Sequence, residues 1–175
     1  MERIGEGLKA VIVNPSIILG CGDWETGSAS LFKNIFHEFP WYSDGVTGFV
    51  DVQDVVRAMI MLMESDVNSD RFILSAENRS FKQVFDFIAE GFGKKAPHKK
   101  VTPFLASVVW RWEKLRSAFN GKEPLVTRET ARMAFKKTHY SNEKFLQQFP
   151  GFAYTPLKQT IFQSCQAFQQ KLNMR

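Results

Sequence analysis

The chain has 175 residues, of which 44% are hydrophobic and 23% are charged, both close to the averages of globular domains. This composition excludes a disordered, collagen-like or low-complexity chain. The 17 Phe and 4 Trp side chains predict large apolar surfaces that must be buried. The net charge of +5 comes from scattered residues and gives only weak support to a nucleic-acid partner.

Cysteine and histidine are sparse and dispersed. Cys21 and Cys165 lie far apart in the sequence, which favours free thiols over a secreted disulfide scaffold. The three His residues are isolated from one another and from the cysteines, so we expect no metal site. The longest uncharged apolar run, residues 58–63, is far shorter than the ~20 residues of a membrane span. Because the chain also starts without a signal peptide, we expect a cytoplasmic protein with no membrane partner.

Strand-like and helix-like segments alternate over the first 75 residues. The apolar run at 9–13, closed by Asn14-Pro15, predicts a buried strand of a parallel sheet, and residues 71–75 predict another. Residues 27–39 predict a helix that Ser28 or Ser30 could cap. Asp51 is the expected N-cap of a second helix, whose apolar residues share one face: Val52, Val55, Val56, Met59, Ile60 and Met63. This alternation is typical of an α/β fold.

The remainder of the chain is predicted to be mostly helical. Ser80 and Gln83 form an expected capping box, and Gly93 ends the helix that follows. Further helices are predicted at 103–119, at 127–135, from Ser141 to Pro150, and from Pro156 to the end of the chain, with Leu172 on the inner face of the last.

One string of residues matches a catalytic pattern. On a helix, Tyr140 and Lys144 would share a face, and the ammonium could lower the pKa of the phenol for proton transfer. We favour a structural role, because this short string follows the last predicted strand. No Gly-rich phosphate loop is present, and Asp51 and Asp54 are better explained as a helix start. We therefore assign no catalytic residue.

Two basic stretches could contact phosphates. The first lies at residues 94–100, and the second consists of Arg128, Arg132 and Lys136 at helical spacing. No aromatic platform interleaves with the first, and the second equally suits the outer face of an amphipathic helix. We interpret both as solvated faces, which leaves a basic nucleic-acid-binding domain as the weakest alternative.

Three stretches together resemble one known family. Residues 10–20 (AVIVNPSIILG), 48–58 (GFVDVQDVVRA) and 72–80 (FILSAENRS) are similar in order and spacing to extended short-chain dehydrogenases/reductases, which include the NAD-dependent epimerase/dehydratase and dihydroflavonol reductase groups. The resemblance covers essentially the whole chain but only the C-terminal half of the family. The chain looks like a member that begins just after its catalytic helix.

This resemblance implies a fold and an activity. The fold would be the last parallel strands of a Rossmann-type sheet followed by a small, mostly helical substrate-binding lobe. Residues 1–80 would be the remnant of the NAD(P)-binding domain, with a substrate-loop insertion at about 20–48, and residues 81–175 would form the lobe. The parent activity would be hydride transfer between NAD or NADP and a small-molecule carbonyl or hydroxyl substrate. Since the family's catalytic Tyr/Lys pair and Gly-rich loop lie upstream, the isolated chain is expected to be inactive.

The resemblance also implies site residues. Pro15, Ser16 and Ile17 would line the nicotinamide, largely through backbone groups, and Ser28 or Ser30 would reach a cofactor phosphate at a helix N-terminus. A plain N-cap explains these two serines equally well. The loop that contains Cys21 and Trp24 would border the substrate pocket.

Two other functions stay open. The chain could be a non-enzymatic binding module, or it could associate with itself through sheet edges left unpaired by the absent half. Its protein partner would then be either the missing N-terminal half or a second copy.

Overall fold

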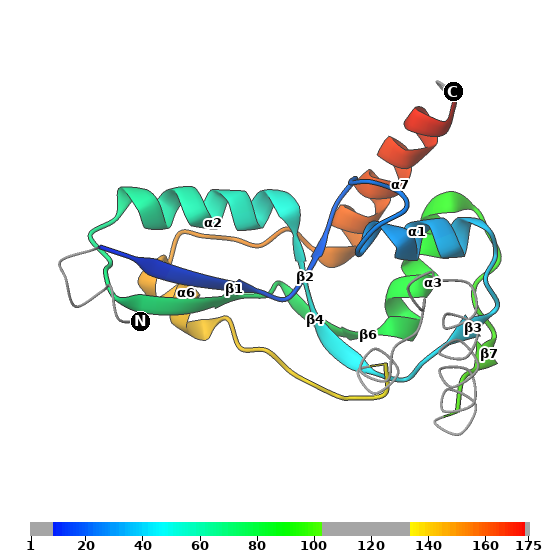
Figure 1. The fold of residues 1–175 in the computed structure, drawn as a ribbon, viewed down its shortest axis with the longest axis horizontal. Helices are drawn as coiled ribbons and strands as arrows, with labels where there is room; N and C mark the ends of the chain where they lie inside the picture. Colours follow the sequence, from blue (N-terminus) through cyan, green and yellow to red (C-terminus); the bar gives the residue numbers. More distant parts are fainter. Residues whose placement is uncertain (1–8, 103–133, 174–175) are drawn as a thin grey trace, which may run out of the picture.

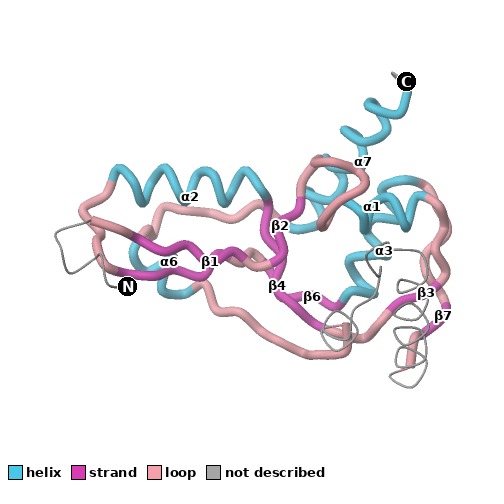
Figure 2. Tube along the Cα trace, in the orientation of Figure 1, coloured by secondary structure: helices cyan, strands magenta, loops and turns pink. Residues whose placement is uncertain are grey.

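The computed structural model describes residues 9–102 and 134–173. Strands and helices alternate along these residues, which confirms the predicted α/β class (Figures 1 and 2). The strands are β1 (Val11–Pro15), β2 (Ile17–Leu19), β3 (Trp41–Tyr42), β4 (Val46–Asp51), β5 (Asp70–Leu74), β6 (Glu77–Ser80) and β7 (Lys99–Lys100). The helices are α1 (Ala29–Phe36), α2 (Val52–Glu64), α3 (Phe81–Phe92), α6 (Glu143–Gln148) and α7 (Leu157–Asn173).

The described strands form three small sheets. β1 and β5 are parallel, with Pro15 opposite Leu74, which confirms the predicted parallel pairing. In the second sheet β4 lies between β2, to which it is parallel, and β6, to which it is antiparallel. β3 and β7 form a short parallel pair. The chain therefore passes from the β1–β5 pair to the β2–β4 pair with only Ser16 between β1 and β2.

The hydrophobic core has two parts that meet at β2 and β4. The first, which we call the α3–α7 core, is built mainly by α1, α3 and α7 and includes Leu19 and Phe49. The second, the α2–α6 core, includes Val50 and the inner residues of β1, β5, α2 and α6. Phe49 and Val50 are consecutive in β4 and point to opposite faces, as strand geometry requires. β4 is thus covered on both sides.

Two helix starts are as predicted. The Asp51 carboxylate accepts a hydrogen bond from Gln53 N (2.7 Å), so Asp51 caps α2. At α3, Ser80 Oγ accepts a hydrogen bond from Gln83 N, and Gln83 Oε1 accepts one from Ser80 N, each at 3.2 Å. Gly93, at φ +64°, ends α3 in the left-handed conformation that favours glycine.

The apolar face predicted for α2 is divided in the structure. Val55 is buried with Ala58 and Leu62, but the other five predicted members of the face are exposed. They form a continuous patch that we call the α2 stripe: Val52, Val56, Met59, Ile60 and Met63. The expectation of one buried face was wrong because the apolar arc is wider than the surface that covers it.

β1 and β5 are also less buried than predicted. Phe72 and Leu74 are buried in the α2–α6 core, but on the opposite face of the same pair Ile12 and Ile73 are 40% and 37% exposed. A strand of a parallel sheet is usually covered on both faces. The continuous apolar sequence fits that rule, yet the described residues cover only one side of this pair.

Several predicted boundaries move. α1 ends at Phe36 rather than at residue 39, since Glu38 has a positive φ of 56°, and Phe39 is exposed. Thr47 and Gly48 lie inside β4, within the span where a substrate loop was expected at about 20–48. Leu172, expected on the inner face of α7, is exposed. The helices predicted at 103–119 and 127–135 lie largely outside the described residues.

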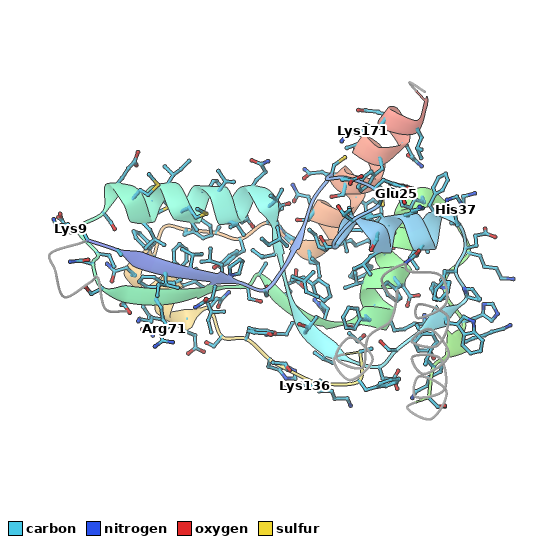
Figure 3. All side chains as sticks on the ribbon, in the orientation of Figure 1. Lys9, Glu25, His37, Arg71, Lys136 and Lys171 are labelled. Atoms are coloured by element: carbon cyan, nitrogen blue, oxygen red, sulfur yellow. The ribbon has the colours of Figure 1, made fainter. Side chains whose placement is uncertain are left out.

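Across the described ranges, no helix is long and apolar enough to span a bilayer, and no three potential metal ligands cluster. Charged side chains are spread over separate elements: Lys9 precedes β1, Arg71 is on β5 and Lys171 is at the end of α7 (Figure 3). The first basic stretch, at 94–100, joins α3 to β7, where Lys99 lies over the ring of Trp41 and Lys100 pairs with Asp44.

Candidate functional site

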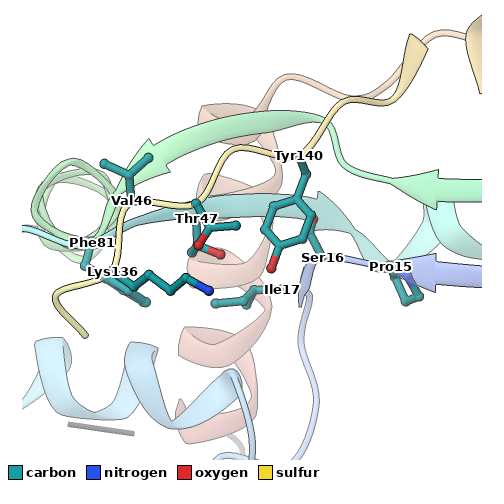
Figure 4. Close-up of a pocket in the computed structure, with 9 residues that line it drawn as sticks. Pro15, Ser16, Ile17, Val46, Thr47, Phe81, Lys136 and Tyr140 are labelled. Atoms are coloured by element: carbon teal, nitrogen blue, oxygen red, sulfur yellow. The ribbon is translucent and has the colours of Figure 1, made fainter. Parts of the chain in front are cut away.

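A pocket of about 320 Å³ opens where β1 passes into β2 (Figure 4). Its wall combines the β1–β2 junction with the start of β4, the start of α3 and the segment that precedes α6. The lining residues are Pro15, Ser16, Ile17, Val46, Thr47, Phe81, Lys136, Thr138 and Tyr140. We call it the junction pocket.

The junction pocket exists because strands diverge at Ser16. Pro15 is the last residue of β1 paired with β5, and Ile17 is the first residue of β2 paired with β4, opposite Phe49. Between them, Ser16 N donates to Leu74 O (2.9 Å), so Ser16 holds the end of the first parallel pair. A crevice at the carboxyl ends of diverging parallel strands is the usual ligand site of open α/β sheets.

Gly48 lets the walls of the pocket approach each other. A Cβ atom added to Gly48 would overlap Ser75 Oγ and would lie 2.9 Å from both Ser16 Cβ and Tyr140 Cδ2. Asn78 on β6 fixes the other side of Tyr140: its amide nitrogen donates to Tyr140 O and its amide oxygen accepts from Tyr140 N, both at 2.9 Å. The position of the Tyr140 ring therefore depends on glycine at 48.

Several hydroxyl groups around the pocket could still form hydrogen bonds with a ligand. Ser16 Oγ and Thr138 Oγ1 are buried without a hydrogen-bond partner among the described residues, and so is Ser75 Oγ beside Gly48. A buried hydroxyl without a partner costs about 1–3 kcal/mol, which a bound polar group or water would recover. Lys136 and Tyr140 extend toward Ile17 from the opposite wall (Figure 4).

Ser28 and Ser30 stand at the start of α1 but do not cap it. Ser28 occupies the N-cap position in a helical conformation, and its hydroxyl donates to Ile18 O instead of accepting from the helix. The Ser30 hydroxyl donates to Gly27 O (2.7 Å). Either hydroxyl would have to leave its carbonyl group before it could donate to a phosphate, and the assignment of Ser28 or Ser30 to a phosphate stays a prediction.

Cys21 and Trp24 lie away from the junction pocket. Cys21 is partly buried against the α3–α7 core. Trp24 meets Phe36, Phe92 and Phe168 edge-on, with its centroid 4.7 Å from that of Phe168. Trp24 also borders a second pocket, of about 290 Å³, with the neighbouring loop and the end of α7. A substrate role for Cys21 and Trp24 stays a prediction.

The Tyr140–Lys144 string does not form a catalytic pair. α6 begins only at Glu143, so Tyr140 lies before the helix and the two side chains do not share a helical face. Lys144 forms an ion pair with Asp70, whose pKa it holds below the usual range, and it also donates to Arg71 O (3.2 Å). Lys144 thus ties α6 to β5, in line with the structural role predicted for the string.

Sequence reasoning missed the wall opposite Pro15, Ser16 and Ile17. Thr47, Phe81, Lys136, Thr138 and Tyr140 reach the pocket from segments distant in sequence. A parallel bridge between Val46 and Lys137 brings the segment with Lys136, Thr138 and Tyr140 beside β4. No local sequence pattern predicts such a bridge, so the sequence contained no usable signal for this wall.

No protein-family model matches the chain. Among curated proteins, it is 26% identical over 104 residues to sterol demethylase protein B of Methylococcus capsulatus, covering 57% of this chain and 31% of that protein. It is 29% identical over 90 residues to cinnamoyl-CoA reductase 1 of Arabidopsis thaliana, covering 50% of this chain and 26% of that protein. The chain thus spans less than a third of the length of these relatives.

Solved structures match the chain over nearly its whole length. A nucleoside-diphosphate-sugar epimerase from Pseudomonas aeruginosa superposes with a TM-score of 0.76 at 21% identity, over 97% of this chain and 51% of that one. UDP-glucuronic acid 4-epimerase from Bacillus cereus, solved with UDP-glucuronic acid and NAD, superposes with a TM-score of 0.66 at 12% identity, over 97% and 48%. The chain has the α/β fold of about half of each of these epimerase chains.

The expected fold is therefore confirmed, as is the family resemblance seen in the sequence. In the extended short-chain dehydrogenase/reductase fold, this chain supplies the parallel pairs β1–β5 and β2–β4 and the helices α3 and α7. It spans about half the length of the solved structures it matches.

Proposed function

We propose that this chain forms the substrate side of an NAD(P)-dependent oxidoreductase or epimerase. The junction pocket would hold the reacting carbonyl or hydroxyl group of a small-molecule substrate. The observation that carries this proposal is a pair of buried hydroxyls, Ser16 Oγ and Thr138 Oγ1, where two parallel strand pairs diverge. Neither hydroxyl has a hydrogen-bond partner within the described part of the chain. A hydroxyl can donate to a carbonyl oxygen and can accept from a hydroxyl group, so both substrate forms suit it.

The wall formed by Pro15, Ser16 and Ile17 fits the nicotinamide end of NAD or NADP. It offers apolar surface from Pro15 and Ile17 to the flat ring, and backbone groups of the same segment would face the carboxamide. When bound, the nicotinamide supplies or accepts a hydride. In this proposal residues 1–80 contribute the cofactor wall, and residues 81–175 contribute the substrate wall through Phe81, Lys136, Thr138 and Tyr140.

The isolated chain is expected to catalyse no oxidation or reduction of a substrate. Its sequence has no Gly-rich phosphate loop, and its Lys144 is committed to Asp70 rather than to a tyrosine. We expect no oxidation of NADPH with a cinnamoyl-CoA substrate and no reduction of NAD with UDP-glucuronic acid, in each case above the protein-free rate and measured by absorbance of the reduced nicotinamide. Either reaction, if it disappears in Pro15→Ala or Ser30→Ala, would contradict this expectation.

Binding to the junction pocket is expected to depend on Gly48. In Gly48→Ala the new Cβ displaces Ser75, Ser16 or Tyr140, so affinity for the pocket's ligand should fall by about tenfold or more. NADPH, UDP-glucuronic acid and cinnamoyl-CoA would each be titrated while the amide resonances of Ile17, Thr47 and Tyr140 are followed by NMR.

Two further variants keep this test informative. Gly151→Ala is the matched control, because a Cβ added there meets no atom within 4 Å, and it should bind as the unchanged chain does. Tyr140→Phe removes one pocket hydroxyl without adding bulk, and it should weaken binding even if Gly48→Ala folds poorly. If none of the three probes shifts the pocket resonances, or if Gly48→Ala and Tyr140→Phe both bind normally, the junction pocket is not the substrate site.

A further inference from the structure

Lys136 gives the junction pocket a positive charge. Among the described residues that line this pocket, no other side chain is charged, and none is an aspartate or a glutamate. The Lys136 side chain extends along the wall opposite the β1–β2 junction, and its ammonium group points toward Ile17 (Figure 4). No acidic group in the described lining therefore offsets this ammonium group inside the pocket.

Five other lysines form ion pairs with acidic side chains, but Lys136 does not. The pairs are Lys33–Glu25, Lys82–Asp86, Lys100–Asp44, Lys144–Asp70 and Lys158–Glu90. Within residues 9–102 and 134–173, the Lys136 ammonium group has no partner, so its three N–H donors remain for solvent or a ligand. A solvated lysine alone would not indicate a site. This one shares its pocket with Ser16 Oγ and Thr138 Oγ1, two buried hydroxyls that have no partner among the same residues.

The backbone on both sides of Lys136 is held against β4. Val46 N donates to Lys136 O (3.1 Å), and Thr138 N donates to Val46 O (2.8 Å), on either side of the bridge between Val46 and Lys137. In such an extended segment, successive side chains point to opposite sides. Lys136 and Thr138 accordingly line the pocket, whereas Lys137, between them, does not. Of these two adjacent lysines, only Lys136 can reach a ligand in the pocket.

We propose, on the basis of the function proposed above, that the junction pocket selects substrates with a carboxylate close to the reacting carbonyl or hydroxyl group, and that Lys136 binds this carboxylate. An ionised carboxylate only accepts hydrogen bonds, so it suits the Lys136 ammonium group and the Thr138 hydroxyl, two residues apart on one wall. Ser16 Oγ, on the opposite wall, remains for the reacting oxygen. The substrate would thus be a small oxo or hydroxy acid.

The pocket suits the single charge of a carboxylate better than a phosphate group. Its described lining has one ammonium group and no arginine, the residue that binds phosphate through two parallel hydrogen bonds. A helix N-terminus is another usual phosphate site, and α3 begins at Phe81 on the pocket wall. However, Phe81 N donates to Gly45 O (3.0 Å) and Gln83 N donates to Ser80 Oγ (3.2 Å), so these two amide groups of α3 are already used. The hydrocarbon part of the substrate would contact the apolar lining, which consists of Pro15, Ile17, Val46 and Phe81.

Two matched ligands and two matched variants test this assignment. 2-Oxo-4-phenylbutyrate and its amide have nearly the same size, but only the acid is charged. Each would be titrated into the unchanged chain, Lys136→Met and Lys137→Met while the amide resonances of Ile17, Thr47 and Tyr140 are followed by NMR. Methionine keeps the apolar stem of lysine without its charge, and both lysines are exposed, so both variants should fold. Lys137→Met is the control, because it lowers the net charge of +5 by the same amount as Lys136→Met.

We expect the acid to bind about tenfold or more tightly than the amide, both in the unchanged chain and in Lys137→Met, because hydrogen bonds to charged groups are the strong ones. In Lys136→Met the two ligands should bind alike. Equal binding of acid and amide to the unchanged chain would overturn the proposal, as would the same loss of acid binding in both variants. Absence of binding by both ligands would also overturn it. The proposed function is judged separately, by the binding of NADPH, UDP-glucuronic acid and cinnamoyl-CoA and by its dependence on Gly48.

Discussion

Asp54→Ala should lower the free energy of unfolding by about 3 kcal/mol, because it removes hydrogen bonds to a buried carboxylate. Asp54 is fully buried, with 0% of its surface exposed. Its two oxygens accept from Thr155 N (2.7 Å) and Thr155 Oγ1 (3.0 Å), and Arg57 forms an ion pair with it. These bonds tie α2 to the segment that leads into α7, and alanine leaves the Thr155 N–H without its partner.

Urea denaturation followed by circular dichroism measures this loss. Asp66→Ala is the control, because Asp66 is exposed after the end of α2, and its effect should stay within about 0.5 kcal/mol. If the two variants unfold at the same urea concentration, Asp54 does not have the structural role assigned to it.

Burial, together with the Asp54 carboxylate, also raises the pKa of Tyr154 to about 12, so this tyrosine stays protonated throughout the experiment at neutral pH.

Phe145→Ala should cost about 3–5 kcal/mol, the range for truncating a fully buried aromatic side chain. Phe145 has no exposed surface, and its ring meets those of Phe72, Phe149 and Phe152 with centroids between 5.0 and 5.9 Å apart. It is the main apolar residue that attaches α6 to the sheet, since α6 has only six residues and cannot persist alone.

The matched control is Phe39→Ala. Phe39 is 49% exposed beyond the end of α1, so the same truncation should cost far less there. Both free energies come from the same urea curves. A cost for Phe145→Ala no larger than that of Phe39→Ala would contradict the burial described for α6.

The sequence was most informative where structure depends on neighbouring residues. Asp51 and the Ser80–Gln83 box marked the starts of α2 and α3, since the bonds of a helix cap span only two or three residues. The uninterrupted apolar run before Pro15 predicted parallel pairing for the same local reason. By contrast, β6 is wholly polar (Glu77–Ser80), and it is a strand because it pairs with β4 and because Glu77 accepts from the distant Leu157 N (2.9 Å).

Only one wall of the candidate site could be predicted from the sequence. Pro15, Ser16 and Ile17 could be proposed from the family resemblance of residues 10–20, and all three line the junction pocket. Thr138 and Tyr140 could not, because their place depends on the pairing of residue 137 with Val46, 91 residues earlier in the chain. Nothing next to Gly48 in the sequence predicts its role, which is to let Tyr140 and Ser16 lie close to β4.

The alternation of Phe49 and Val50 makes β4 a wall shared by two cores, and this has a consequence for cooperativity. A strand that contributes consecutive residues to both cores cannot leave one without exposing the other. Opening of either core should therefore propagate to its neighbour, so that the described parts of the chain unfold as one unit rather than as separate foldons. A ligand in the junction pocket, held at the edge of this wall by Thr47, would then slow hydrogen exchange on both sides of β4 at once.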